Sequence, residues 1–301
     1  MKDLTKYQGI FPAFYACYAE DGSISPERVE ALTEYLIGKG VTGVYVGGSS
    51  GECIYQSVAE RKTVLEHVMK VAKGRIVVIA HVACNNTADS MELAAHAESL
   101  GVDAIAAIPP IYFHLPPYGV AQYWNDISSA APHTDFVIYN IPQLAGVALN
   151  GGLLRTMLEN PNVIGVKNSS MPVQDIEMWR DEGAVVFNGP DEQLLSGLTA
   201  GACGGIGGTY AVMPELYLAM NAHLEKGEIA KARAIQYEAN RIIYKMCSAH
   251  GNLYAVQKEI LRRMYGLELG SVRAPMPGLI PEDEPIVAEA QAMIEAAIAK
   301  L

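Results

Sequence analysis

The sequence predicts an α/β protein, a (β/α)8 barrel (TIM barrel) with a C-terminal helical appendage. Three observations lead to this fold class. Eight short apolar runs recur between residues 9 and 208, a helical pattern follows each run, and beyond about residue 212 only helical patterns remain. Nearly continuous apolar strands joined by helices indicate a parallel sheet that is covered on both faces. Eight such units in about 220 residues suit a closed barrel.

The predicted strands are apolar along most of their length. They are 9–18 (GIFPAFYACY), 43–48 (GVYVGG), 75–82 (RIVVIAHV), 104–110 (AIAAIPP), 135–142 (DFVIYNIP), 163–170 (VIGVKNSS), 184–190 (AVVFNGP) and 201–208 (GACGGIGG). The alternative is a doubly wound open sheet, which usually carries a glycine fingerprint after its first strand. The segment FYACYAEDGS at that place is not such a fingerprint.

Helix starts can be recognised between these strands. Ser25-Pro26 reads as an N-cap followed by proline at the first helical position. The segment SVAE, Ser57 to Glu60, is a capping box, and Thr87 is the expected cap of the next helix.

The C-terminal part reads as helical throughout. Apolar residues from Ile235 to Met246 recur at helical spacing, and 252–266 and 284–301 predict further helices. A proline-rich connector is expected at 273–285. We therefore expect a barrel domain over residues 1–225 and a helical domain over 226–301.

Composition restricts the classes of partner. The chain has 301 residues, 50% of them hydrophobic, which is enough for a sizeable core. Its 33 acidic and 22 basic residues give a formal charge of −11, and no basic block is interleaved with aromatic residues. Nucleic acid and anionic membranes are therefore not expected partners.

Cysteine usage and the N-terminal segment both favour a cytoplasmic location. The N-terminal residues lack the continuous apolar core of a signal peptide. The five cysteines are odd in number and scattered, with no CxxC pair. This pattern suggests neither a disulfide framework nor a zinc site.

The ends of the predicted strands carry polar residues, and in a barrel the chemistry is found at these ends. Lys167 ends the sixth strand on the face that period-two alternation assigns to Val163 and Gly165, and the glycine leaves room beneath the lysine stem. If this face points inward, burial lowers the pKa of Lys167 and frees its lone pair. A neutral amine attacks carbonyls to form a Schiff base. The plainer interpretation is a solvated strand end.

Three further groups end neighbouring strands. Tyr139 shares a face with Val137 and could carry protons, although it could equally be a core residue. The turn GGSSGE (47–52) offers two hydroxyls and several N–H groups to a carboxylate, but could be only a turn. Asp191 and Glu192 suit the hydroxyls of a polyol, or simply begin a helix.

Two other features have simpler explanations. The segment GGIGG (204–208) could bind phosphate, but no lysine or arginine lies near it in sequence and two acidic residues are nearby. His81 lies close to Cys84, yet nothing completes a metal site, and it reads as a rim or core histidine.

Taken together, these motifs resemble the N-acetylneuraminate lyase and dihydrodipicolinate synthase superfamily of pyruvate-dependent class I aldolases. The resemblance extends from GIFPAF to the RAP connector and rests on GGSSGE, YNIPQLAG, GVKNSS and GACGGIGGTY in the same order and spacing. The segments AHVAC and FNGPDEQLLSGLTAG look most like the lyase branch. The synthase branch is expected to carry an arginine where this chain has Leu144.

The resemblance implies a role for each candidate residue. Lys167 would form the Schiff base, Tyr139 would be the acid/base group, and Ser49 and Ser50 would hold the keto-acid carboxylate. Sugar contacts are implied for five residues: Ser169, Gly189, Asp191, Glu192 and Gly208. Tyr112 would reach the relay of a neighbouring subunit in a homotetramer. The pyruvate imine on Lys167 would serve as electron sink, so neither a cofactor nor a metal is expected.

The chain departs from the family pattern at several positions. Ser50 and Ser169 stand where the lyase commonly has threonine, and Gly208 stands where a sugar-contacting serine is expected. Pro190 replaces an aromatic residue, and Pro109 and Ile111 alter the segment before Tyr112.

The implied activity is the reversible cleavage of N-acetylneuraminate to N-acetylmannosamine and pyruvate. Two alternatives remain open. One is a related aldolase with another acceptor, such as another sugar acid or the aspartate semialdehyde of the synthase reaction. The other is a non-catalytic sugar-acid sensor, which would bind its ligand without forming an imine.

Overall fold

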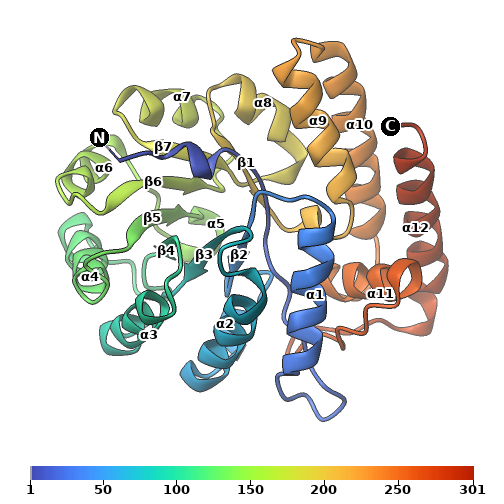
Figure 1. The fold of residues 1–301 in the computed structure, drawn as a ribbon, viewed down its shortest axis with the longest axis horizontal. Helices are drawn as coiled ribbons and strands as arrows, with labels where there is room; N and C mark the ends of the chain where they lie inside the picture. The colour runs from blue at the N-terminus through green and yellow to red at the C-terminus, as the bar shows by residue number, and fades with distance from the viewer. Residues whose placement is uncertain (1) are drawn as a thin grey trace.

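The computed structural model describes residues 2–301 and confirms the barrel, with helices surrounding a ring of parallel strands (Figure 1). The strands are β1 (Gly9–Pro12), β2 (Gly43–Val46), β3 (Val77–His81), β4 (Ala104–Ala107), β5 (Asp135–Asn140), β6 (Val163–Asn168), β7 (Val185–Asn188) and β8 (Gly204–Gly207). Their order is β1-β8-β7-β6-β5-β4-β3-β2. A parallel bridge between Ala13 and Tyr45 closes the ring between β1 and β2.

Twelve α-helices and five 3-10 turns are defined in the described residues. The α-helices are α1 (Pro26–Gly38), α2 (Val58–Ala72), α3 (Thr87–Leu100), α4 (Pro117–Ser129), α5 (Pro142–Ala145), α6 (Gly151–Leu158), α7 (Gln174–Asp181), α8 (Leu194–Thr199), α9 (Pro214–Glu225), α10 (Ile229–Met246), α11 (Leu253–Tyr265) and α12 (Glu284–Ile298). The 3-10 turns are η1 (Thr5–Tyr7), η2 (Cys53–Tyr55), η3 (Asp191–Gln193), η4 (Thr209–Ala211) and η5 (Pro281–Asp283). None of the helices in residues 2–301 is long and apolar enough to cross a membrane.

Two of the three predicted helix caps are confirmed. The Ser25 side chain accepts from the Arg28 N–H, and Ser57 and Glu60 form the reciprocal capping box. The prediction for Thr87 is wrong, because Asn86 is the cap and accepts from the Asp89 N–H at 2.8 Å. Asn86 has the extended backbone that an N-cap needs, whereas Thr87 is already helical.

The first strand is shorter than its apolar run. The sequence predicts a strand over 9–18, but β1 ends at Pro12. Residues beyond it form their backbone hydrogen bonds elsewhere, since the Tyr18 N–H donates to the Leu269 carbonyl and the Ala16 N–H to that of Ser50. The apolar run 9–18 therefore extends beyond the strand, into a segment that packs against the C-terminal part of the chain.

Strand β6 contains an irregularity that the predicted alternation missed. Its register with β5 shifts between Phe136, opposite Val163, and Val137, opposite Gly165. Val163 consequently packs in the outer core between strands and helices, whereas Ile164 lies in the core inside the barrel. The prediction that Val163 shares the face of Lys167 is therefore wrong. A bulge of this kind re-aims the residues that follow it.

Gly165 also has a different role from the one expected. A Cβ at this position would overlap the backbone of Val185 on β7. The glycine therefore permits the close approach of two neighbouring strands. It does not serve to leave room beneath the lysine stem.

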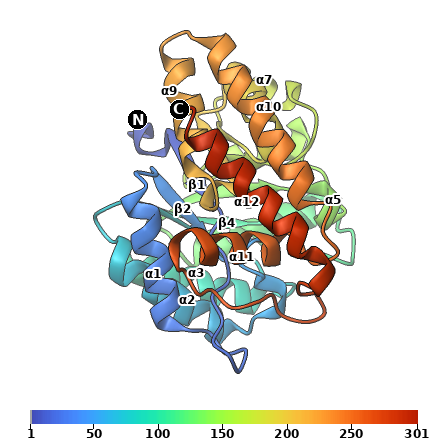
Figure 2. The same ribbon diagram turned by 90° about the vertical axis from the view of Figure 1, so that its right-hand side faces the viewer.

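The C-terminal helices gather on one side of the barrel. Figure 1 shows α10, α11 and α12 together beside α9, and Figure 2 shows α12 running across that side of the molecule. The predicted connector is too long at its C-terminal end, because α12 begins at Glu284 and takes Pro285 into its first turn. Proline is well tolerated there. The division into domains at residue 225 stays a prediction.

Candidate active site

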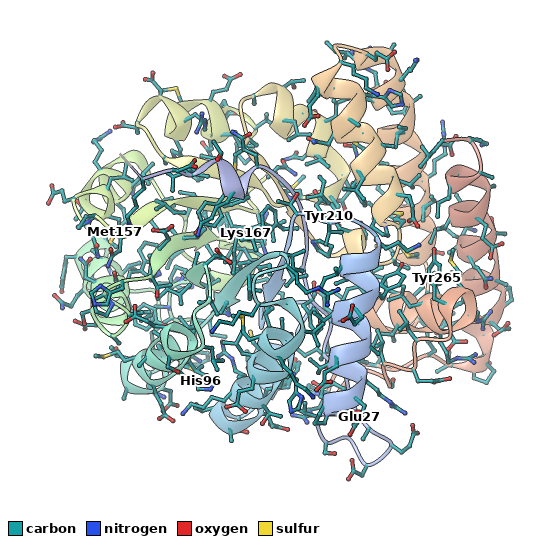
Figure 3. The ribbon with its side chains drawn as sticks, in the orientation of Figure 1. Glu27, His96, Met157, Lys167, Tyr210 and Tyr265 are labelled. Atoms are coloured by element: carbon teal, nitrogen blue, oxygen red, sulfur yellow. The ribbon has the colours of Figure 1, made fainter. Side chains whose placement is uncertain are left out.

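Lys167 is buried near the middle of the ring of strands, as Figure 3 shows. Only 4% of its surface is exposed. Its Nζ lies 4.0 Å from the ring centre of Tyr45 and 3.9 Å from that of Tyr139. Burial lowers the pKa of Lys167 from 10.5 to about 7, with the negative charge of Asp191 acting in the opposite direction. A large fraction of Lys167 is therefore a neutral, nucleophilic amine at neutral pH.

Tyr139 stands beside Lys167 because their strands are in register at this point. Its ring packs edge-on against Tyr45 and His81, with ring centres 5.7 and 6.0 Å away. Burial raises the pKa of Tyr139 to about 12, whereas hydrogen bonding from the Ser49 and Ser169 side chains lowers it. Tyr139 is thus a protonated phenol at neutral pH, with two hydroxyl groups beside it through which a proton could pass.

The turn that carries Ser49 and Ser50 meets two other parts of the chain. Burial raises the pKa of Tyr254 on α11 to about 12, and hydrogen bonding from Ser50 opposes this. A Cβ on Gly208 would lie 3.2 Å from the Ser50 hydroxyl and 3.9 Å from the Tyr254 ring. Ser50, Gly208 and Tyr254 therefore converge, and a hydroxyl-bearing side chain at 208 would be tight against Ser50.

Asp191 is the buried acid of the cluster. Its Oδ2 accepts from the backbone N–H of Thr209 at 2.7 Å and from the Thr209 hydroxyl at 2.6 Å. Burial raises the pKa of Asp191 to about 6, while the Thr209 hydrogen bonds lower it. The neighbouring Glu192 is exposed. Thr209 occupies Oδ2, so Oδ1 is the oxygen that is left for a ligand.

Ser169 and Gly189 lie side by side at the ends of β6 and β7. A Cβ on Gly189 would overlap the Ser169 hydroxyl. The glycine is required here because the two strand ends come so close together. Nine of the ten residues singled out from the sequence, all except Tyr112, thus belong to the ends of strands β2, β5, β6, β7 and β8.

Helix α10 supports the turn that bears Asp191 and Glu192. The Gln236 side chain donates to the Asp191 carbonyl at 3.0 Å and accepts from the Leu195 N–H at 2.9 Å. Asn240 accepts from Gln236 at 2.8 Å and donates to the Glu192 carbonyl at 3.0 Å. Two amides of the C-terminal part therefore fix both acidic residues through their backbone.

Sequence reasoning did not identify several of these contributors. They are Tyr45, Thr209, Gln236, Asn240 and Tyr254. Tyr45 lies inside a strand, where an aromatic residue reads as core. The two amides and Tyr254 come from helices that only the tertiary fold brings to the site.

Tyr112 lies apart from this cluster within the chain. It is 86% exposed, has a positive φ of 81°, and packs edge-on against Phe113. Both aromatic residues line an open cavity of 850 Å³ together with Tyr118, which is 80% exposed. Exposed aromatic surface of this kind is typical of an interface.

His81 is a core histidine, in agreement with its sequence-based interpretation. It is buried, its Nδ1 lies 2.8 Å from the Gly47 carbonyl oxygen, and burial holds its pKa well below the usual range. Within residues 2–301, no three His, Cys, Asp or Glu side chains are grouped so that they could hold a metal ion.

A buried neutral amine, a phenol beside it and a hydroxyl-lined turn define a barrel enzyme site suited to carbonyl chemistry. Residues 6–297 match the dihydrodipicolinate synthetase family, and the chain belongs to this family. The family assignment agrees with the resemblance seen in the sequence.

Within this family, the chain is similar to lyases that are named for sialic acid. It is 66% identical over 297 residues to the N-acetylneuraminate lyase of Mediterraneibacter gnavus, with 98% of this chain and 94% of that protein covered. It is 34% identical to the Escherichia coli N-acetylneuraminate lyase, with 97% of each covered. A catalytic lysine mutant of the Ruminococcus gnavus sialic acid aldolase superimposes with a TM-score of 0.99 at 65% identity, covering 100% and 99% of the two chains.

Proposed function

We propose that this chain is a class I aldolase that cleaves N-acetylneuraminate reversibly to N-acetylmannosamine and pyruvate. The observation that carries the proposal is the buried Lys167, with a pKa of about 7 and its amine against the ring of Tyr139. The names of the relatives support the substrate, and the Ruminococcus gnavus aldolase has a lysine that is called catalytic.

The proposed mechanism begins with the neutral Lys167 amine. It attacks the keto carbon of the sugar acid, and loss of water gives a protonated imine. Tyr139 takes the proton of the hydroxyl on the carbon that becomes the aldehyde carbon, and passes its own proton on through the Ser49 hydroxyl beside it. The imine accepts the electron pair as the carbon–carbon bond breaks, which releases the aldehyde and leaves an enamine on Lys167. Protonation of the enamine carbon and hydrolysis of the resulting imine by water then release pyruvate and the free lysine. This sequence requires neither a metal nor an organic cofactor.

Both ends of the substrate have proposed partners. Ser49 and Ser50 hold the keto-acid carboxylate. At the sugar end, Ser169 and Gly189 line one side, while Asp191 Oδ1 and Glu192 accept hydroxyl hydrogen bonds. Gly208 provides no hydroxyl, so this site makes one fewer direct contact to the sugar than a serine would allow.

A homotetramer in the cytoplasm completes the proposal. The exposed aromatic residues Tyr112, Phe113 and Tyr118 would be covered by a second copy, and Tyr112 would approach the Tyr139 relay of that copy. Mass measurement in solution tests the oligomeric state, and a monomer would contradict it.

The test of the activity is intact-protein mass after incubation with N-acetylneuraminate and borohydride, beside a parallel sample with pyruvate. Reduction makes an imine permanent. We expect the same pyruvate-sized adduct in both samples, and none in Lys167→Ala, which should retain the fold but lose turnover.

The alternatives give different outcomes. An adduct from pyruvate alone would indicate an aldolase with another acceptor. Binding of N-acetylneuraminate without any adduct would indicate a sensor. An unchanged adduct in Lys167→Ala would contradict the assignment of the imine to this residue.

A further inference from the structure

Glu52 has a strained backbone directly after the Ser49–Ser50 turn. Its φ of 54° and ψ of 34° are left-handed, a conformation that residues other than glycine rarely adopt. The Glu52 N–H donates to the Ser49 carbonyl at 3.0 Å, so the position of Glu52 determines how the turn closes. A residue persists in such a conformation only where its surroundings hold it.

The surroundings hold Glu52 by its carboxylate, which is completely buried. Oε1 accepts from the Lys258 ammonium at 3.0 Å, and Oε2 accepts from the Tyr18 hydroxyl at 3.1 Å and the Arg273 backbone N–H at 2.8 Å. Lys258 is itself 1% exposed at its side chain and also donates to the Ser271 carbonyl at 2.9 Å. Two of the three donors to Glu52 thus come from the part of the chain after residue 252.

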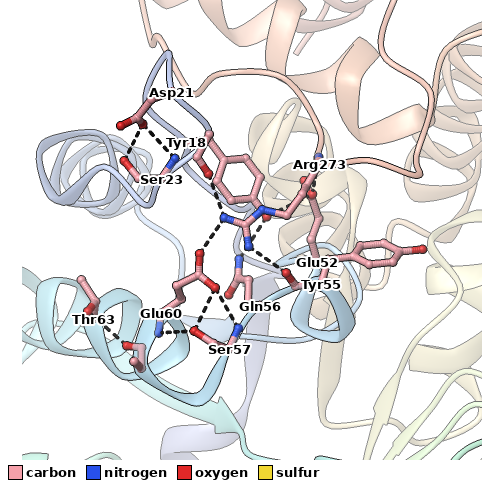
Figure 4. A network of polar contacts seen from close by, with 12 residues as sticks. Tyr18, Asp21, Ser23, Glu52, Tyr55, Gln56, Ser57, Glu60, Thr63 and Arg273 are labelled. Atoms are coloured by element: carbon pink, nitrogen blue, oxygen red, sulfur yellow. Dashed lines mark hydrogen bonds and ion pairs between the residues drawn. The ribbon is translucent and has the colours of Figure 1, made fainter.

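The Arg273 side chain holds the elements that follow Glu52 (Figure 4). Its guanidinium donates to the Tyr55 carbonyl at 2.7 Å and to the Glu60 carboxylate at 2.6 Å, and lies 4.6 Å from the centre of the Tyr18 ring. Glu60 is more exposed and belongs to the cap of α2, eight residues beyond Glu52. Glu60 therefore forms an ion pair with Arg273, but it does not contact the Ser49–Ser50 turn.

We propose that Glu52 is a positioning residue for the keto-acid carboxylate site, with Lys258, Tyr18 and the Arg273 backbone as its anchors. This inference rests on the proposed function, because it assigns Ser49 and Ser50 to that carboxylate. Without its anchors, the strained residue relaxes to an ordinary φ, the turn opens, and both hydroxyls move away from the ligand. Ser49 then also loses its place beside Tyr139.

The test compares variants that remove or retain the anchor. Glu52→Leu combined with Lys258→Met removes both buried charges, and apolar replacement of a buried ion pair is commonly tolerated by the fold. Glu52→Gln with Lys258→Met retains an acceptor oxygen for Tyr18 and Arg273. Glu60→Gln is the matched control, since it weakens the attachment of the same segment away from the turn.

The measured quantity is the pyruvate concentration that gives half-maximal borohydride trapping on Lys167, with thermal melting as a check of folding. For Glu52→Leu/Lys258→Met, we expect this pyruvate concentration to rise about ten- to hundredfold. This is the range expected for loss of hydrogen bonds to a charged group. For Glu52→Gln/Lys258→Met, the concentration should return most of the way to the wild-type value. For Glu60→Gln, it should stay within about twofold of wild type.

Several outcomes would overturn the inference. One is a folded Glu52→Leu/Lys258→Met variant that needs the same pyruvate concentration as wild type for half-maximal trapping. Another is a Glu60→Gln variant in which this concentration rises as much as in Glu52→Leu/Lys258→Met. If Glu52→Leu/Lys258→Met does not fold, Tyr18→Phe takes its place, because it deletes a single donor to Oε2. It should raise the half-saturating pyruvate concentration several-fold, and no change would contradict the proposal.

The same experiment separates failure of the inference from failure of the proposed function. If wild type fails to trap pyruvate, the proposed function fails together with this inference. If wild type traps pyruvate and the variants show no shift, the inference alone is overturned.

Discussion

Replacing Lys167 by methionine should abolish the chemistry and make the protein more stable. Methionine is unbranched, apolar and of similar length, so it fits the same space. Burial lowers the pKa of Lys167 from 10.5 to about 7. At about 1.4 kcal/mol per unit, keeping the ammonium buried costs about 5 kcal/mol of unfolding free energy.

The stability gain should depend on pH with a definite sign. Below pH 7, native and unfolded wild type both bind the proton, and the full cost of burial applies. Between pH 7 and 10.5, the unfolded chain binds more protons than the native one, so wild-type stability rises with pH. Lys167→Met should therefore be up to about 4 kcal/mol more stable at pH 7, and this advantage should shrink towards pH 10.

Urea midpoints at pH 6.5 to 9.5 and fixed protein concentration would measure the effect. Constant concentration matters because a multimer gains stability from association. A variant that is less stable than wild type at pH 7 would refute the reasoning. An advantage that does not change with pH would also refute it, because it would mean that Lys167 remains protonated and well solvated in the native state.

Three further predictions concern the reaction. The initial rate of pyruvate trapping on Lys167 should fall about tenfold per unit below pH 7 and level off above it; a rate that still rises between pH 8 and 10 would contradict the pKa. Tyr139→Phe should lower turnover of N-acetylneuraminate by about 10²- to 10⁴-fold while the pyruvate adduct still forms, and equal loss of both in the mass assay would argue against a proton-transfer role. Gln236→Leu should raise KM for N-acetylneuraminate about tenfold by releasing the Asp191 turn, with half-saturation by pyruvate unchanged; a shift in both constants would show a general loss of structure instead.

The barrel could be predicted from the sequence because its signals are local. An apolar run in a parallel sheet and a capping box such as Ser57–Glu60 are each read within a few residues. The strand ends then bring Lys167, Tyr139 and the serine turn to one edge whatever the details of packing. The same rule placed Asp191 near Lys167, although they are 24 residues apart.

The parts that could not be predicted depend on contacts between distant segments. Alternation placed Val163 on the wrong face, because a register shift against β5 leaves no mark in the β6 sequence. Gly165 looked like space for a side chain, but the deciding neighbour is the backbone of Val185 on another strand. Thr87 and Asn86 are both capping residue types, and only the backbone angles distinguish them.

The support of the Asp191 turn by Gln236 and Asn240 has a consequence for engineering and evolution. Under the proposed assignment of Asp191 and Glu192 to the sugar, substitutions on the outer helix α10 should alter selectivity for the sugar, while the strand ends proposed to carry the imine chemistry keep their sequence. A library restricted to these two helical positions would therefore search acceptor range with little loss of the lysine's reactivity. Lineages of such barrels could acquire new acceptors in the same way, by drift at positions of α10 that act on the acidic turn only through its backbone.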